Sequence, residues 1–235
     1  MIKEQQSPVN VSRRRALFGA LSVAGAAVAA ACGSSSPTSP LVGDGGTTST
    51  NSQCEVTPGE TAGPYPSRAD FLRSDIREGK AGTVLALTVK VVNVNGSCAP
   101  VSGADVEIWH CDVAGDYSQY GSQTAATFLR GIQTTGANGE VTFTTIYPGW
   151  YQGRATHIHA EVTIGGRSIK VTQVAFPESI NNVVHTSGVY ASRGANPTSN
   201  LSDGIFADSL ASELVTPSGS PSSGYSATFQ IGINS

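Results

Sequence analysis

Residues 151–164 read Tyr-Gln-Gly-Arg-Ala-Thr-His-Ile-His-Ala-Glu-Val-Thr-Ile, and their second half predicts a β-strand from His157 to Ile164. Successive side chains of a strand point to opposite faces, so His157 and His159 should project to one side and Ile158 to the other. Two imidazoles on one strand face make half of a metal site. We therefore expect one face of this strand to join an apolar layer and the other to carry a functional site.

Two tyrosines accompany these histidines. Tyr151 starts the same stretch, and Tyr117 ends the segment Trp-His-Cys-Asp-Val-Ala-Gly-Asp-Tyr that begins at Trp109. A phenol has a reference pKa of about 10, which makes tyrosine a poor ligand for zinc or copper(II) at neutral pH. A trivalent hard cation favours the phenolate oxygen strongly enough to deprotonate it. The combination of tyrosines with histidines therefore indicates iron(III), with one ion per chain.

Strand signals recur along the chain and are separated by turn markers such as Asn95-Gly96 and Gly165-Gly166. The composition agrees, since 27 glycines and a charged fraction of 13% favour strands and turns over helices. We predict an all-β fold, an antiparallel β-sandwich with long loops, over residues 54–235. One short helix is expected near Ile205 to Leu214. The other predicted strands are Val84 to Val94, Ala104 to His110, Glu140 to Ile146, Ile169 to Phe176 and Ser226 to Ile233.

The first residues are typical of an export signal. A basic patch, Ser12-Arg-Arg-Arg15, precedes an apolar run from Ala16 to Ala31 that is shorter than the roughly 20 residues needed to cross a bilayer. The paired arginines favour the twin-arginine route for residues 1–32, with an ordinary secretory signal as the alternative. We therefore expect the mature protein outside the cytoplasm.

The end of this signal resembles a lipoprotein processing site. Ala29-Ala-Ala-Cys32 would place an acylated Cys32 at the new N-terminus and tether the protein to a membrane, although cleavage after Ala31 and release is the alternative. Residues 33–53 are mostly Ser, Thr, Gly and Pro, which predicts a flexible linker.

Three cysteines remain after Cys32, and an oxidising compartment favours one disulfide with one thiol left over. Cys54 and Cys98 lie in turn-rich segments, whereas Cys111 lies on or beside a strand. We favour a bridge between Cys54 and Cys98, with Cys111 as a buried apolar residue. The net charge of -3 provides no basic stripe for a nucleic acid.

The motifs occur in the order found in one enzyme family. From about Cys54 to Phe176 the chain resembles the intradiol ring-cleaving dioxygenases, the non-haem iron(III) family that includes protocatechuate 3,4-dioxygenase and catechol 1,2-dioxygenase. The blocks that carry the resemblance are Glu60-Thr-Ala-Gly-Pro-Tyr65, Gly103-Ala-Asp-Val-Glu-Ile-Trp-His110, Gly115-Asp-Tyr117, Arg130-Gly-Ile-Gln-Thr, Thr145-Ile-Tyr-Pro-Gly-Trp-Tyr151, Arg154-Ala-Thr-His-Ile-His159 and Thr172-Gln173.

This resemblance implies that Tyr117 and His157 are equatorial iron ligands and that Tyr151 and His159 are axial ligands, with hydroxide in the fifth position. Iron(III) with two phenolates and one hydroxide is neutral, so it can occupy a partly dry pocket. A catechol would bind through both oxygens as a dianion, with the hydroxide and Tyr151 as proton acceptors. Reaction with O2 would open the ring between the two hydroxylated carbons and give a muconate-type dicarboxylate.

Further roles follow from the same resemblance. Arg154 would stabilise the negative charge that develops on the substrate, and Gln173 matches a glutamine just outside the ligand set. Trp109 would line the pocket, and Gly63, Pro64 and Tyr65 would close over the ring. The catalytic set is Arg154, Tyr151 and Gln173, and the substrate-binding set is Gly63, Pro64, Tyr65, Trp109 and Trp150.

The chain departs from the family pattern at two places. Only Gln152 and Gly153 separate Tyr151 from Arg154, where the well-known enzymes insert about ten residues, so the pocket should be more open. Trp150 could supply the missing aromatic surface. Ala62 stands where many relatives carry glutamate. These differences bear on the substrate and on the oligomeric state, for which monomer and homodimer both stay open.

Plainer interpretations exist for each residue. Arg154 could pair with a carboxylate across the sheet, and Trp109 could be core packing. His110 should be a hydrogen-bonded structural residue, and His185 should be solvated. For the whole chain, the alternatives are a non-catalytic secreted sandwich of transthyretin-like or carbohydrate-binding type, and a copper or zinc enzyme that uses the two strand histidines.

Overall fold

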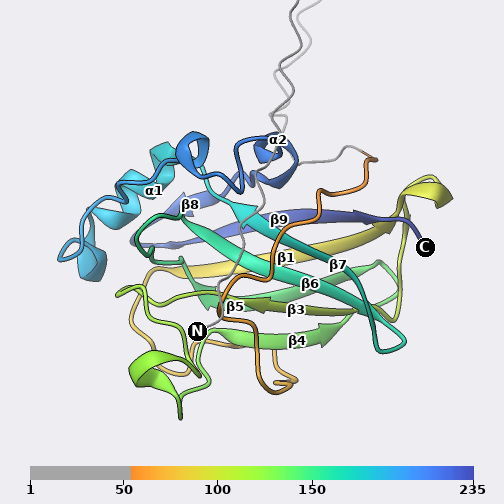
Figure 1. Cartoon of the computed structure of the whole chain (residues 1–235), viewed down its shortest axis with the longest axis horizontal. Coiled ribbons are helices and arrows are strands. Elements are labelled where there is room, and N and C mark those ends of the chain that lie inside the picture. Colours follow the sequence, from red (N-terminus) through yellow and green to blue (C-terminus); the bar gives the residue numbers. More distant parts are fainter. Residues whose placement is uncertain (1–53) are drawn as a thin grey trace, which may run out of the picture. The chain divides into compact units, whose positions relative to one another are not determined.

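The computed structural model describes residues 54–235, which form two β-sheets packed face to face (Figure 1). The predicted export signal with Cys32 and the predicted linker lie outside the described residues. The predicted all-β sandwich is confirmed. No helix in the described part of the chain has the length and apolar character needed to cross a membrane.

The first sheet contains the longest strands. Its order is β2-β1-β9-β8, and β5 also pairs with β1. The pairing of β1 with β9 is parallel, which departs from the antiparallel prediction. Parallel neighbours need a long connection, and here most of the domain lies between them. The bounds are β1 (Val84–Asn93), β2 (Ala99–Pro100), β5 (Glu140–Ile146), β8 (Ser218–Ser220) and β9 (Gly224–Ile233).

The second sheet is antiparallel throughout, with the order β4-β3-β6-β7. Trp109 on β3 pairs with His159 on β6, which pairs in turn with Gln173 on β7. Directly paired residues of neighbouring strands share a face of the sheet, so these three side chains form a row. The bounds are β3 (Asp105–Trp109), β4 (Arg130–Thr134), β6 (His157–Ile164) and β7 (Arg167–Ala175).

The core lies between the sheets and is built from alternate strand residues. On β6, the fully buried Ile158, Ala160 and Val162 belong to the core cluster, together with Phe143 and Phe229 of the first sheet. His157 and His159 take the intervening positions. The second sheet therefore turns its histidine-bearing face away from the core, as the alternation predicts.

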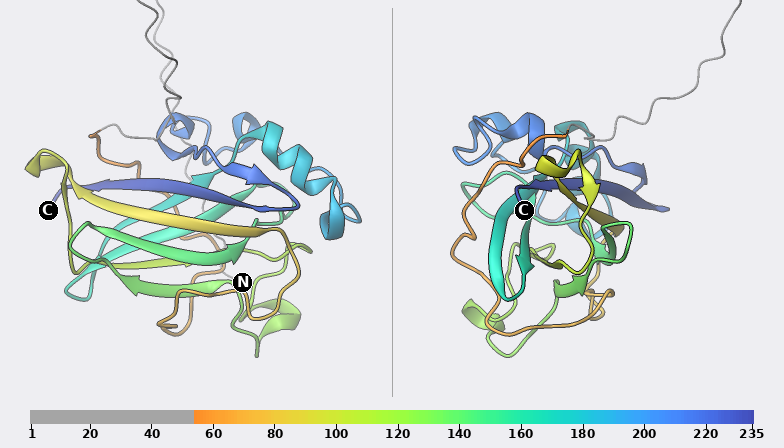
Figure 2. Two further views of the ribbon diagram at one scale, coloured as in Figure 1. Left: turned by 180° about the vertical axis from the view of Figure 1, so that it is seen from behind. Right: turned by 90° about the vertical axis from the view of Figure 1, so that its right-hand side faces the viewer.

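Short helices lie outside the sandwich (Figure 2). The sequence missed α1, because its Asn and Val residues are weak helix formers. Tertiary contacts hold it instead, since Asn181 accepts a hydrogen bond from the Tyr147 hydroxyl and donates one to the Phe176 carbonyl. The α-helices are α1 (Glu178–His185) and α2 (Leu210–Glu213), and the 3₁₀ turns are η1 (Val94–Gly96), η2 (Gly121–Gln123), η3 (Gly188–Tyr190) and η4 (Asn200–Ser202).

Of the two histidines that lie outside the strands, one has the environment that the sequence predicted and the other does not. His110 is buried and hydrogen-bonds through its two ring nitrogens to the Cys111 carbonyl and the Thr145 hydroxyl, so the structural interpretation is confirmed. The prediction that His185 is solvated is wrong. His185 is 1% exposed at the end of α1, because the helix turns it toward the Pro148 carbonyl.

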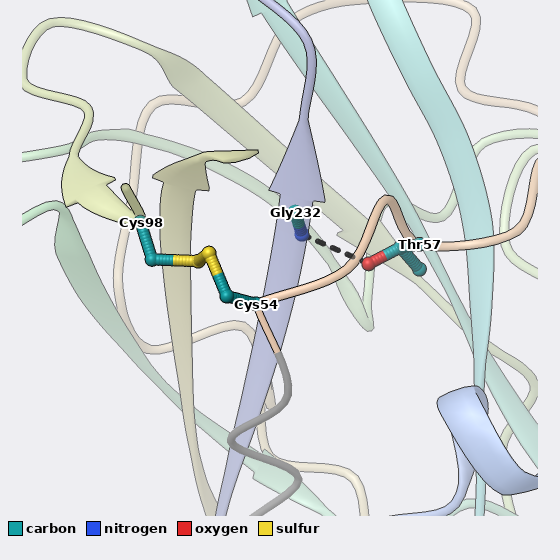
Figure 3. Close-up of a disulfide and its surroundings, with 4 residues drawn as sticks. All are labelled: Cys54, Thr57, Cys98 and Gly232. Atoms are coloured by element: carbon teal, nitrogen blue, oxygen red, sulfur yellow. Dashed lines mark hydrogen bonds between the residues drawn. A yellow bond between two sulfur atoms is a disulfide. The ribbon is translucent and has the colours of Figure 1, made fainter. Parts of the chain in front are cut away.

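Residues 54–68, which we call the strap, cross from the first sheet to the second. Thr57 hydrogen-bonds to Gly232 on β9, and Glu60 donates its backbone N–H to Val171 on β7. Cys54 at the start of the strap is disulfide-bonded to Cys98 (Figure 3), which is the pairing that the sequence favours. Cys111 is free and buried.

We predict that the disulfide stabilises the domain. Its cysteines are 44 residues apart, and a closed loop of this length is worth about 3–4 kcal/mol in the chain-entropy description. Replacing both cysteines, Cys54→Ser with Cys98→Ser, should lower the urea-unfolding free energy by that order. Reductant should lower the stability of the wild type and leave the double variant unchanged. Equal stability of the two proteins without reductant would contradict the prediction.

Candidate active site

The candidate site lies on the outer face of the second sheet, beneath the strap. The Trp109 ring stacks on the His159 ring with centroids 4.9 Å apart and planes within 3°. Trp109, Cys111 and Tyr117 form a buried cluster, against which Tyr65 of the strap packs. Trp109 is thus packed in a buried cluster, and its predicted role in lining a substrate pocket stays a prediction.

The two imidazoles face each other. Nε2 of His157 is 3.2 Å from Nε2 of His159. The Nδ1–H of His157 donates to the Ala155 carbonyl at 2.6 Å, which leaves a lone pair on Nε2. Nδ1 of His159 is buried without a hydrogen-bond partner. The Nε2 atoms of His157 and His159 therefore face each other at short range, and Nδ1 of His159 has no hydrogen-bond partner.

The two phenols adjoin the imidazoles, although they come from separate loops. The Tyr151 ring centroid is 5.7 Å from that of Tyr117 and 5.6 Å from that of His157. The Tyr117 centroid is 6.4 Å from that of His159. The Tyr117 hydroxyl is buried and has no hydrogen-bond partner. The structure therefore brings the four predicted ligand side chains into one cluster.

Burial keeps all four groups uncharged. It lowers the pKa of His157 to about 3 and, with the neighbouring His157, holds the pKa of His159 well below its ordinary value. It also raises the pKa of Tyr117 well above 10 and raises that of Tyr151. Neutral imidazole is the form that binds a metal. A cation in this cluster would supply the positive charge that phenolate formation needs.

These donors fit a ferric ion. Two nitrogens bound to one metal at about 2.1 Å and at right angles lie about 3 Å apart, close to the observed separation of 3.2 Å. The unpartnered Tyr117 hydroxyl supplies an oxygen donor in the same cluster. Within residues 54–235, no group of three or more His, Cys, Asp or Glu side chains is placed to hold a metal.

Arg154 is held beside this cluster by three side chains. Its Nη1 lies 3.4 Å from the Tyr151 hydroxyl, and its Nη2 donates to Oε1 of Gln173 at 2.6 Å. Its Nε donates to Oδ2 of Asp203 at 2.8 Å. Arg154 thus pairs with a carboxylate that comes from the loop after η4 rather than from across the sheet, and it also adjoins the predicted ligand Tyr151.

The strap forms a wall of the site. Nε2 of Gln173 donates to the Thr61 carbonyl. Gly63 has a φ of +67°, and a Cβ there would lie 3.0 Å from Cε1 of His159. The Tyr65 ring stacks on Tyr117 with centroids 4.6 Å apart. The segment around Pro64 therefore adjoins the ligand cluster, where the sequence predicted a substrate wall.

Arg130 was missed as a positioning group by sequence reasoning. It is fully buried at the start of β4, and its Nη1 donates to the Tyr65 carbonyl and the Ser67 hydroxyl. Its Nε and Nη2 donate to the hydroxyl and the carbonyl of Ser118, the residue after Tyr117. One guanidinium thus ties the strap to the Tyr117 loop. Arg130 begins one of the blocks that carry the family resemblance, and this was the signal that could have revealed it.

Trp150 lies in different surroundings. Its Nε1 donates to the Gly194 carbonyl at 2.9 Å, and the Arg193 guanidinium lies 4.2 Å from its ring centroid. These contacts are to the loop after η3 rather than to the ligand cluster. Its role in framing a substrate stays a prediction. The adjacent turn is short, with Gln152 and Gly153 exposed at its tip, and a more open pocket stays a prediction.

The carboxyl groups of Glu213 and Glu60 lie near the strand residue Thr172, which precedes Gln173. Glu213 on α2 is fully buried and accepts hydrogen bonds from Ser209 at 2.6 Å and from Thr172 at 3.1 Å. Oε1 of Glu60, in the strap, is 3.3 Å from the same Ser209 hydroxyl. Burial raises the pKa of Glu213 to about 7 and also raises that of Glu60.

Comparison with known proteins gives a consistent result. A family profile described as Dioxygenase matches residues 61–168. The intradiol ring-cleavage dioxygenase from Tetranychus urticae is 31% identical with a TM-score of 0.72, and the match covers 77% of this chain and 95% of that one. The dioxygenase domain of a dioxygenase carbohydrate-binding protein fusion from Streptomyces sp. SirexAA-E is 28% identical, with a TM-score of 0.59 and coverages of 77% and 99%. Hydroxyquinol 1,2-dioxygenase from Pseudomonas putida DLL-E4 shares the fold at 18% identity, with a TM-score of 0.58 and coverages of 80% and 68%.

The raised pKa of Glu213 predicts a pH dependence of stability. Unfolded glutamate ionises near pH 4.5, whereas folded Glu213 ionises near pH 7. The folded state therefore binds more protons between these values, and its stability falls as pH rises through that window, by an amount on the order of 2–3 kcal/mol. Glu213→Gln, which stays neutral, should show a smaller fall between pH 5 and pH 8 in urea-unfolding free energy. The matched control, Glu140→Gln on the partly exposed surface of β5, should keep the wild-type slope. Equal slopes for wild type and Glu213→Gln would contradict this assignment.

Proposed function

The chain belongs to the intradiol ring-cleavage dioxygenase family, and we propose that it is an iron(III) enzyme that opens catechol-type diols between the two hydroxylated carbons with O2. Both oxygen atoms would enter a muconate-type dicarboxylate. The family supports an oxygenase role for the chain. The metal, the substrate and the residue roles are part of the proposal.

One observation carries the proposal. Two neutral imidazoles from β6 and two phenols from separate loops meet in one cluster, with Nε2 atoms 3.2 Å apart and one buried phenol unpartnered. A non-catalytic binding module has no use for this cluster, and a buried unpartnered hydroxyl costs about 1–3 kcal/mol. A zinc or copper site at the histidines would leave the phenols without a function.

Tyr117, Tyr151, His157 and His159 would hold the metal. When bound, iron(III) supplies Lewis acidity that increases the reactivity of a chelated diol toward O2. The protein keeps each donor in place by other contacts. The Ala155 carbonyl fixes the ring of His157 through Nδ1, and Trp109 stacks along the ring of His159. The strap, which packs against Tyr117 and Gln173, would limit the access of water to the ligand cluster.

The remaining residues would manage protons and charge. As the phenolate that a bound metal would favour, Tyr151 would accept one of the two diol protons at Oη, and burial would then favour the protonated phenol. Nη1 of Arg154 lies beside that oxygen and would stabilise negative charge developing on the substrate. Gln173 would hold Arg154 and, through the Thr61 carbonyl, the strap. The substrate ring would lie against Gly63, Pro64 and Tyr65.

The predicted export signal extends the proposal to location. We propose that the enzyme acts outside the cytoplasm, tethered through Cys32 or released, on a diol present there. The twin-arginine route carries folded proteins, so the metal could be loaded before export.

Oxygen uptake tests the activity directly. Iron-loaded protein should consume O2 with at least one diol from a panel of catechol, protocatechuate, hydroxyquinol and caffeate. The product should absorb in the near ultraviolet as an acyclic dicarboxylate. Absence of uptake with all four, from protein shown to contain iron, would overturn the enzyme proposal.

The ligand assignment predicts a colour. Phenolate bound to iron(III) gives a wine-red charge-transfer band, which zinc-loaded or metal-free protein lacks. Tyr117→Phe and His159→Ala should each lose most of this absorbance and reduce turnover at least 100-fold. Tyr225→Phe, a matched tyrosine-to-phenylalanine change at a largely buried residue of β9 outside the cluster, should keep both. Retention of colour and turnover in Tyr117→Phe would remove that residue from the ligand set.

A further inference from the structure

Asp203 is the residue that fixes the orientation of Arg154. The two side chains form an ion pair in which the Asp203 carboxylate is 1% exposed and the Arg154 side chain is 15% exposed. Oδ2 of Asp203 accepts from Nε of Arg154 at 2.8 Å and from the backbone N–H of Ala155 at 2.7 Å. A single carboxylate oxygen thus holds both the guanidinium and the backbone that follows it.

The Asp203 carboxylate is also held in place by contacts within its own loop. Oδ1 of Asp203 accepts from the backbone N–H of Ile205 at 2.9 Å, and the Asp203 N–H donates to the Ser199 carbonyl at 3.0 Å. The preceding η4 turn is closed by a reciprocal pair of hydrogen bonds between Ser199 and Ser202. The loop therefore presents the carboxylate in one orientation.

These contacts occupy different edges of the guanidinium. Asp203 takes Nε, Gln173 takes Nη2, and Nη1 is left facing the Tyr151 hydroxyl at 3.4 Å. The Arg154 side chain has many rotamers when it is not held, and its planar donors act only in a fixed direction. Gln173 alone would allow the group to swing about one hydrogen bond. Two anchors set the plane and hence the direction of Nη1.

We propose that Asp203 is a positioning residue for the ring-cleavage reaction: it binds Nε of Arg154 and so directs Nη1 toward the place where substrate oxygens would meet Tyr151. This inference rests on the proposed function and adds a residue to it. A displacement of about 1 Å in such a group can reduce a rate about 100-fold. The effect should fall on the step in which negative charge develops, and not on diol binding.

A purely structural role would look different. Asn196 ties the same C-terminal region to residue 154, because its Nδ2 donates to the Arg154 carbonyl at 3.0 Å. Asn196 does not bind the guanidinium. Asn196→Ala therefore removes a comparable attachment without changing the orientation of Nη1, and it is the matched control for Asp203→Asn.

Stopped-flow absorbance on iron-loaded protein separates the two roles. Catechol is mixed with enzyme without O2, and the shift of the visible band gives the binding phase; O2 is then added, and the decay gives the oxygen-dependent phase. Asp203→Asn should slow the oxygen-dependent phase at least tenfold and leave the binding phase within twofold of wild type. Asn196→Ala should leave both phases within twofold, even if its melting temperature falls.

Several outcomes would overturn the inference. An oxygen-dependent phase within twofold of wild type in folded Asp203→Asn does so, and so does an equal slowing of both phases. If Asp203→Asn does not fold, Asp203→Glu decides, because it keeps the buried charge and shifts it by one methylene; wild-type kinetics in that variant also overturn the positioning role. A wild type with no oxygen-dependent phase for any diol instead overturns the proposed function.

Discussion

The two-residue period of β6 is the constraint on which the rest of the structure depends. Ile158, Ala160 and Val162 fill the space between the sheets, so the side chains between them must point outward. One strand thus contributes to the core and to the site at once. A shift by one residue would bury the histidines among core residues and expose the isoleucine. The stability of the sandwich and the direction of both imidazoles are therefore set by the same register.

The electrostatic character of the site follows from what covers that outer face. Trp109 and Tyr65 exclude water from Tyr117 and His159, and this burial keeps phenol and imidazole neutral. The fixed charges nearby are neutralised or enclosed. Arg154 has Asp203 as its counter-ion, and Arg130 is surrounded by neutral oxygen acceptors. Such a site is suited to an ion that is neutralised by its own ligands.

The sequence predicted those features whose cause is local. The alternation around Ile158 and the turn markers between strands were sufficient for most strands and for the sandwich. Strand β4 was missed as a whole, because a charged residue followed by glycine at Arg130 and Gly131 lacks the apolar alternation of a strand. Helix α1 was missed because its helical state depends on contacts of Asn181 with Tyr147 and Phe176.

In the site too, the residues in local motifs could be predicted, whereas those that depend on distant contacts could not. The resemblance to the family pointed to the four candidate ligands and to Arg154, because these residues lie in short blocks that match the family's motifs. Asp203 could not be found in this way, because it returns to Arg154 from 49 residues further along the chain. An aspartate followed by glycine is typical of a turn, and only the folded loop reveals its partner.

The parallel pairing of β1 with β9 has a consequence for how the domain is made. β9 lies in the interior of its sheet, between β1 and β8, and it pairs with a strand from the opposite end of the domain. The first sheet therefore stays split until Gly224–Ile233 has emerged from the ribosome, and closing so long a loop makes assembly slow. A nascent chain must keep β1 from pairing with the edges of other proteins during this interval, which makes chaperone protection most valuable until β9 has been made.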